Sequence, residues 1–244
     1  MPADAPTILA TSGGLRRGER TMLSFGPLLL HLIELAGTSG RAPVLGHLGT
    51  AGGDDRAFHA LLGEAAEAAG VQIRHCNLFP MPPSADLADY LGSCDAIWVG
   101  GGSVANLLAL WRLHGVDGVL HACWQAGIPL GGVSAGSLCW HVGGTTDSFG
   151  PELSPVTNGL AFLPYANGVH YDSEERRRPL LQRLVADRTL PPAYATDDGV
   201  GLLYRGSALA EVLAERPGAA AYLVRPSEEG AEEERLTPRL LPGA

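Results

Sequence analysis

The chain has 244 residues, of which 45% are hydrophobic and 18% are charged, and its formal net charge is −9. This length suits one α/β domain and is short for two, so we expect residues 1–244 to form a single domain. The acidic balance and the lack of an extended basic run exclude nucleic acid as the expected partner. Because no apolar run reaches the ~20 residues of a membrane span, we expect no membrane partner either.

The cysteines and the first residues indicate a cytoplasmic protein. None of the four cysteines forms a Cys-x-x-Cys pair. Buried free thiols are the simplest interpretation, and they are typical of a reducing compartment. Residues 1–6 lack a charged segment followed by an apolar one, so we expect no signal peptide.

Strands and helices alternate through the first half of the chain. The predicted strands are 7–11, 43–48, 71–78, 95–99 and 127–130, and the predicted helices are 23–35, 56–69, 86–91, 104–113 and 116–125. This alternation favours an α/β fold in which a parallel sheet lies between two layers of helices. Ligands bind such sheets beyond the carboxyl ends of the strands.

The pattern weakens after residue 142. Residues 143–167 are rich in Gly, Thr, Pro and Ser, which predicts loops with short strands. The last long helix is predicted at 174–187. Short strands at 194–196 and 200–204 flank a turn, and 220–225 and 235–241 are expected to pair as a hairpin. The acidic residues 228–234 between them predict a solvated turn.

A nucleophilic serine is predicted where the fifth strand ends. Gly132-Val133-Ser134-Ala135-Gly136 follows the apolar segment 127–130 and precedes 138–142, which indicates the start of a helix. A strand, a tight turn with serine and a helix form the context of a nucleophile elbow. The two glycines remove Cβ atoms that would clash there, and the helix N-terminus favours negative charge.

A serine nucleophile needs a base, and His170 is the strongest candidate. It lies in the irregular second half, next to polar residues, whereas His141 is placed along the elbow helix and points away from the turn. His47 ends a predicted strand and is a weaker candidate. The others are explained by their positions within predicted helices or a strand: His31, His59, His75, His114 and His121.

The acid that orients the base remains open between two chain orders. Asp147 or Glu152 would lie between the serine and His170, whereas Asp197 or Asp198 would follow His170. His170-x-Asp172 resembles a metal-binding pair, but no third ligand is evident in the sequence. We therefore expect no metal and no cofactor.

The turn Gly100-Gly101-Gly102 predicts an oxyanion hole. Backbone N–H groups of Gly101 or Gly102, together with that of Ala135, suit the charge that develops on an attacked carbonyl. A dinucleotide-binding turn is the competing interpretation. It is disfavoured because the glycines follow the fourth strand and no acidic residue ends the next one.

The order of these motifs resembles the peptidase E family of serine peptidases, whose relatives include the cyanophycinases. The resemblance runs from Ile8 to about Val224. It is carried by five segments: Trp98–Ser103, Gly132–Gly136, Thr145–Asp147, His170–Asp172 and Asp197–Gly199.

The resemblance implies a fold similar to the class I glutamine amidotransferases, with serine in place of cysteine. It implies Ser134 as nucleophile, His170 as base and Asp198 as the acid before a glycine. Ser103 stands where family members often carry Asn, and we expect it to contact substrate together with Asp147 and Arg176.

The expected activity is therefore hydrolysis of short peptides by a serine exopeptidase. Peptidase E carries an arginine that reads an aspartate side chain on a loop that is longer than here, and Glu174 and Glu175 lie near that position. We thus predict a preference for neutral or apolar residues. An amidase or esterase with the same triad and a non-catalytic binding module remain alternatives, and a homodimer is an assembly that the sequence leaves open.

Overall fold

The computed structural model describes residues 5–243. Residues 1–4, on which part of the expectation of no signal peptide rests, and residue 244 lie outside the described residues. Among the described residues, no helix is both long and apolar enough to span a membrane. All four cysteines are buried and free, as predicted.

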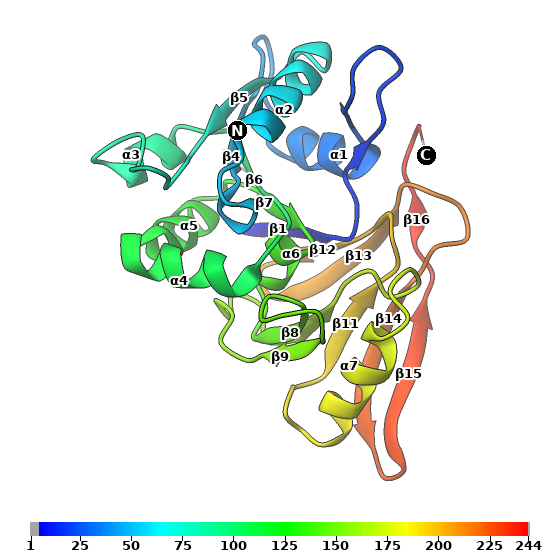
Figure 1. Cartoon of the computed structure of the whole chain (residues 1–244). Coiled ribbons are helices and arrows are strands. Elements are labelled where there is room, and N and C mark those ends of the chain that lie inside the picture. The colour runs from blue at the N-terminus through cyan, green and yellow to red at the C-terminus, as the bar shows by residue number, and fades with distance from the viewer. Residues whose placement is uncertain (1–4, 244) are drawn as a thin grey trace.

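The central sheet runs through the core of the chain (Figure 1). Within residues 5–243 it has eight strands, in the order β16-β13-β12-β1-β7-β6-β4-β5. The strands are β1 Thr7–Thr11, β4 Val44–Leu48, β5 Gln72–His75, β6 Ala96–Val99, β7 Leu130–Val133, β12 Val200–Arg205, β13 Ala208–Ala214 and β16 Arg239–Leu240. The five from β5 to β1 are parallel, and β12 pairs antiparallel with β1.

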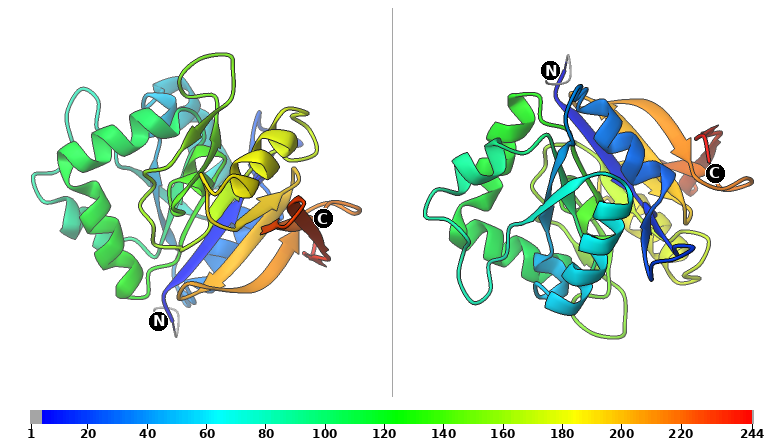
Figure 2. Two further views of the ribbon diagram at one scale, coloured as in Figure 1. Left: turned by 90° about the horizontal axis from the view of Figure 1, so that it is seen from below. Right: turned by 90° about the horizontal axis from the view of Figure 1, so that it is seen from above.

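Helices cover both faces of the central sheet, as Figure 2 shows. They are α1 Pro27–Leu35, α2 Arg56–Ala68, α3 Leu87–Gly92, α4 Val104–His114 and α5 Val116–Gln125. Side chains alternate across a strand, so Trp98 of β6 packs with α1 and α2 while Ile97 and Val99 pack with α4 and α5. The short elements β2 Leu15–Arg16, β3 Ser24–Phe25 and the 3-10 turn η1 Thr50–Gly52 complete this half.

A second sheet follows the serine turn and lies beside the first (Figure 1). Within the described residues it has six strands, in the order β15-β14-β11-β10-β8-β9. They are β8 Gly143–Thr146, β9 Ser154–Val156, β10 Ala166–Gly168, β11 Ala193–Thr196, β14 Ala221–Ser227 and β15 Gly230–Leu236. Helix α7 Arg177–Ala186 covers one face through Leu181 and Val185.

Four predictions for the second half are wrong. Segment 235–241 is not the hairpin partner of 220–225 as a whole, because β14 pairs with β15 at Gly230–Leu236 and β16 pairs with β13. Helix α6 spans only Ala135–Leu138, so 138–142 does not begin the elbow helix. The acidic segment 228–234 is not a turn, because most of it forms β15, which pairs with β14. Side chains alternate along this strand: Glu232 and Glu234 are exposed, whereas Glu233 accepts the Tyr171 hydroxyl. Helix α7 begins at Arg177 and not at 174, since the chain first makes a turn in which Glu174 N–H donates to His170 O.

Candidate active site

Ser134 lies in strained backbone between β7 and α6. Its φ and ψ are 57° and −113°, a region that residues other than glycine rarely adopt. Its N–H donates to Thr11 O over 3.1 Å, which ties the turn to the end of β1. The strain is the backbone signature expected of a nucleophile elbow.

The glycines around the serine allow backbone to pack on backbone. A Cβ on Gly132 would lie 2.4 Å from Gly136 O, and one on Gly136 would lie 2.2 Å from Val99 O. Contacts this short exclude any side chain. The Gly-x-Ser-x-Gly spacing is therefore a steric requirement of this turn.

The Gly100–Gly102 turn lies directly against the serine. A Cβ on Gly101 would lie 3.3 Å from Ser134 Cβ and 3.9 Å from Ser134 Oγ. The N–H of Gly100 already donates to Leu48 O, so the predicted oxyanion hole has only Gly101 and Gly102 to draw on in this turn. Ala135 is the first residue of α6, so its N–H has no partner within that helix.

The hydroxyl of Ser103 is engaged within its own helix. Its Oγ accepts a hydrogen bond from Asn106 N–H at 3.2 Å and so caps the N-terminus of α4. The cap fixes the helix that follows the glycine turn. Ser103 therefore has a structural role as the N-cap of α4, in addition to its predicted contact with substrate.

His170 forms a hydrogen bond with Asp198, which lies in the turn between β11 and β12. His170 Nδ1 donates to Asp198 Oδ1 at 2.6 Å. Burial would raise the pKa of Asp198, but hydrogen bonds from His170 and Ser173 outweigh it and leave that pKa below its ordinary value. The carboxylate is therefore charged at neutral pH and accepts the Nδ1 proton.

Two consecutive residues at the end of β1 hold the serine and histidine segments. Thr11 O accepts the N–H of Ser134, and Ser12 Oγ accepts the N–H of His170 at 3.1 Å. Ser12 Oγ also lies 2.7 Å from Thr196 Oγ1. Ser12 is not among the predicted site residues, although a polar residue directly after a parallel strand is the available signal.

Asp198 is itself supported by two further residues. Asp172 Oδ1 accepts the N–H of Asp198 at 2.8 Å, and Arg216 Nε donates to Asp198 O at 2.6 Å. Arg216 also pairs with Asp172. The carboxylate of Asp172 thus serves the backbone of this turn, and Arg216 carried no signal in the sequence.

The other three carboxylates left open by the sequence do not contact His170. Asp197 is buried and its Oδ2 accepts Ala220 N–H at 2.9 Å. Asp147 is exposed, 4.0 Å from Arg177, and Glu152 pairs with Arg176 at 2.9 Å. Of the four candidates, the structure brings Asp198 to the imidazole.

An acidic pocket opens beside the turn that carries His170. It has a volume of about 440 Å³, and its lining includes Asp147, Glu174, Glu175 and Arg176. Ser148, next to Asp147, accepts the N–H of Ala105 at 3.3 Å, near the start of α4. The pocket wall therefore connects the histidine turn to the helix that follows the glycine turn.

The sequence matches one family over most of its length. The model of peptidase family S51 aligns with residues 8–212. The chain belongs to peptidase family S51. Membership in this family makes it a serine-type peptidase, which decides against the non-catalytic binding module.

Two relatives in sequence and one solved structure are similar to this chain. Uncharacterized peptidase YgaJ of Bacillus subtilis (strain 168) is 35% identical over 221 residues, 91% of this chain and 93% of that one. Peptidase E of Shewanella denitrificans is 32% identical over 135 residues, 52% of this chain and 57% of that one. A crystal structure of a peptidase from an acI-B1 Actinobacterium has a TM-score of 0.68 at 16% identity, covering 96% of this chain and 95% of that one.

The likeness in structure confirms the predicted fold class of this S51 peptidase. Its α/β layers are dominated by parallel strands, as in the peptidase E structures and the class I glutamine amidotransferase-like fold. His141, for which the sequence predicts only that it points away from the serine turn, is buried: its Nδ1 lies 2.9 Å from Ser137 O and its Nε2 lies 3.3 Å from Tyr204 OH.

Proposed function

We propose that this S51 peptidase is an exopeptidase that cleaves short peptides through Ser134, His170 and Asp198. The 2.6 Å hydrogen bond between His170 and Asp198 is the observation that carries the proposal. It supports a histidine whose Nε2 is free to act as a base, on a segment tied through Ser12 to the serine turn.

Each member of the proposed triad has a distinct task. Ser134 Oγ attacks the scissile carbonyl while His170 Nε2 takes its proton, and the same proton then passes to the leaving amine. Asp198 fixes the tautomer and stabilises the imidazolium. Backbone N–H groups of Gly101 or Gly102 and of Ala135 hold the oxyanion, and water releases the acyl group in the reverse sequence.

The acidic pocket supports recognition of a free amino terminus. Three carboxylates and one guanidinium line it, and an ammonium group complements that balance. Asp147 and Glu175 are exposed at the pocket and favour a cation over an anion. We therefore assign the pocket to the amino-terminal end of the substrate.

The three consecutive arginines do not offer a dedicated reader of aspartate. Arg177 is buried and donates to Thr145 O and Glu174, and Arg178 pairs with Glu233 above the Tyr171 ring. Arg176 lies at the pocket but pairs with Glu152. This arrangement supports the preference for neutral or apolar amino-terminal residues.

Blocked dipeptides test the exopeptidase assignment. We expect Leu-Leu to be hydrolysed, N-acetyl-Leu-Leu to be inert, and Leu-Leu-amide to remain a substrate, with the Ser134→Ala protein as control. Cleavage of N-acetyl-Leu-Leu at the rate of Leu-Leu would overturn the assignment of the pocket to the amino terminus. Cleavage within a long peptide blocked at both ends would overturn exopeptidase activity itself.

A further inference from the structure

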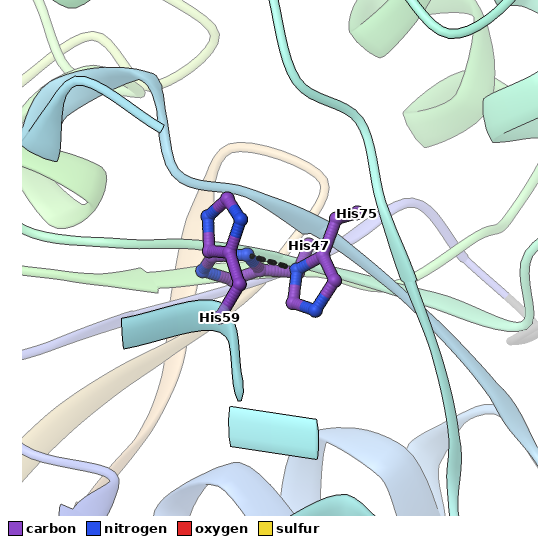
Figure 3. A group of neighbouring side chains, drawn as sticks. All are labelled: His47, His59 and His75. Carbon is purple, nitrogen blue, oxygen red and sulfur yellow. Dashed lines mark hydrogen bonds between the residues drawn. The ribbon is translucent and has the colours of Figure 1, made fainter. Parts of the chain in front are cut away.

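Three histidines far apart in the sequence converge between β4, α2 and β5. His47 and His75 occupy paired positions of β4 and β5, and His59 projects from α2 onto them (Figure 3). One ring nitrogen from each lies within 4.8 Å of the others. None of the three has a task in the proposed peptidase mechanism.

His47 and His59 are buried with unused nitrogens, and His75 is partly buried. His47 is 1% exposed and His59 is 7% exposed. Among the described residues, His47 Nε2 and both ring nitrogens of His59 have no hydrogen-bond partner. The cluster holds one hydrogen bond, at 3.0 Å between the Nδ1 atoms of His47 and His75. Buried polar atoms without partners are unfavourable, and a ligand that accepts their lone pairs would remove that cost.

We propose that His47, His59 and His75 bind one divalent transition-metal ion of the Zn²⁺ class. Imidazole nitrogens suit Zn²⁺, Co²⁺, Ni²⁺ and Cu²⁺, whereas Mg²⁺ and Ca²⁺ need oxygen ligands that this cluster lacks. Three protein nitrogens leave one coordination position of a tetrahedral ion for water or another ligand.

The surroundings support a bound cation. Asp54 is buried, its Oδ1 has no hydrogen-bond partner, and its negative charge acts on His59 more strongly than the opposing positive charge of Arg56. Burial lowers the pKa of His47 and His59, and that of His75 to about 4. All three rings are therefore neutral at pH 7, which is the form that ligates metal.

Binding requires a small rearrangement of the rings. The His59 and His75 rings are stacked with centroids 4.2 Å apart. Ligand nitrogens around a tetrahedral zinc with bonds of about 2.0–2.1 Å lie about 3.3 Å apart. A Cβ on Gly49 would lie 2.6 Å from His59 Nε2, so a glycine at this position leaves room for the ring. The His59 ring also borders a cavity of about 310 Å³ into which it can tilt.

The same cavity reaches the proposed oxyanion hole. Gly100 and Gly101 line it together with His47 and His59. A Cβ on Gly100 would lie 3.5 Å from His47 Nε2, and Gly101 is the residue that lies against Ser134. The proposed ion is thus a neighbour of the peptidase site, but no step of peptide hydrolysis passes through it.

Metal titration of the full chain tests the proposal. After treatment with a chelator, the protein is titrated with Zn²⁺ by calorimetry, and we expect one ion per chain. His59→Gln and His75→Gln should each weaken binding by at least about 10- to 100-fold, the range seen when even outer partners of a metal ligand are removed. The control His114→Gln changes an exposed histidine at the end of α4 and should bind as the wild type does.

Two further measurements keep the result independent of folding and of the peptidase. Ser134→Ala should bind Zn²⁺ like the wild type, so the site stands even where the proposed triad fails. Wild-type protein with Co²⁺ should show the visible bands of tetrahedral nitrogen coordination, whether or not the histidine variants fold. No zinc uptake by the wild type, equal affinity in folded His59→Gln, or a thiolate charge-transfer band with Co²⁺ would each overturn the three-histidine site.

Discussion

The two sheets contribute to the candidate site in different ways. The central sheet places Ser134 and Gly101 at the carboxyl ends of neighbouring parallel strands, β7 and β6. His170 follows β10 of the second sheet, and Asp198 lies where the chain crosses from β11 to β12. One half is therefore specified by a local motif, whereas the other depends on contacts such as His170 with Ser12, 158 residues apart. We therefore expect substitutions in the serine motif to remove peptide-bond cleavage, and substitutions in the long-range contacts to misalign His170 and Asp198 with Ser134.

Ser134→Ala removes the proposed nucleophile and should have the largest effect on kcat. We expect kcat for Leu-Leu to fall by about 10⁴- to 10⁶-fold, as when other triad serines are removed. Circular dichroism should remain that of the wild type, since only one partly buried oxygen is lost. More than about a tenth of wild-type activity in a preparation free of other peptidases would place the nucleophile elsewhere.

Asp198→Asn tests the residue at the crossing between the sheets. An amide there can hold His170 in the wrong tautomer, and kcat should fall by about 10⁴-fold. Asp197→Asn is the matched control, because Asp197 is adjacent but accepts Ala220 N–H instead. A larger loss of kcat in Asp197→Asn, or in Asp147→Asn, would reassign the acid.

Ser12→Ala should misalign the histidine without removing any proposed catalytic group. The N–H of His170 loses its acceptor, and displacement of about 1 Å can lower the rate about 10²-fold. The expected signature is a lower kcat at nearly constant KM, with recovery in Ser12→Thr, which restores the hydroxyl. Equal losses in the alanine and threonine variants would show that Ser12 acts by packing alone.

The pH profile should report the base and not the acid. The pKa of Asp198 lies below its ordinary value, so its carboxylate stays charged from pH 8 to pH 5. Loss of kcat/KM on acidification within this range therefore does not come from Asp198, and a single essential base lowers the rate by at most about tenfold per pH unit. Rates for Leu-Leu that are constant from pH 7.5 to pH 5 would argue against a histidine base.

Substrate choice should show the smallest effect. The carboxylates of the pocket repel an acidic side chain, and solvent screening limits the repulsion at exposed groups. We expect kcat/KM for Asp-Leu to be about tenfold lower than for Leu-Leu, a difference of about 1.4 kcal/mol. Glu175→Gln should reduce the difference in kcat/KM between Asp-Leu and Leu-Leu. A clear preference for Asp-Leu would make Arg176 the first residue to change.

The sequence predicts the parallel strands from β5 to β1 because their signals are local, whereas it offers no strand at β13. The predicted ranges 7–11 and 116–125 are the observed bounds of β1 and α5. The glycines of the elbow are required by close contacts between backbone atoms. Asp55 caps α2, since its side chain accepts the N–H of Ala57. Each of these features depends on residues within a few positions of one another.

The second sheet and the histidine cluster depend on contacts that no local pattern encodes. The charged residues of β15 resemble a turn because β15 lies at the edge of its sheet, where Glu232 and Glu234 are exposed. His47, His59 and His75 each look like ordinary helix or strand residues, and only the pairing of β4 with β5 and the packing of α2 bring them together. Their spacing matches no metal motif, and the expectation of no metal considered only His170 and Asp172, for which no third ligand is evident.

Labelling with a fluorophosphonate tests most directly whether the two sheets form one active site. The reagent reacts with a serine whose hydroxyl is activated by a base, and mass spectrometry locates the modified residue. We predict a single label on Ser134 in the wild type, and labelling at least about 10²-fold slower in His170→Ala and Asp198→Asn that retain the wild-type circular dichroism. A label on another serine, or equal rates in the wild type and His170→Ala, would contradict the proposed triad.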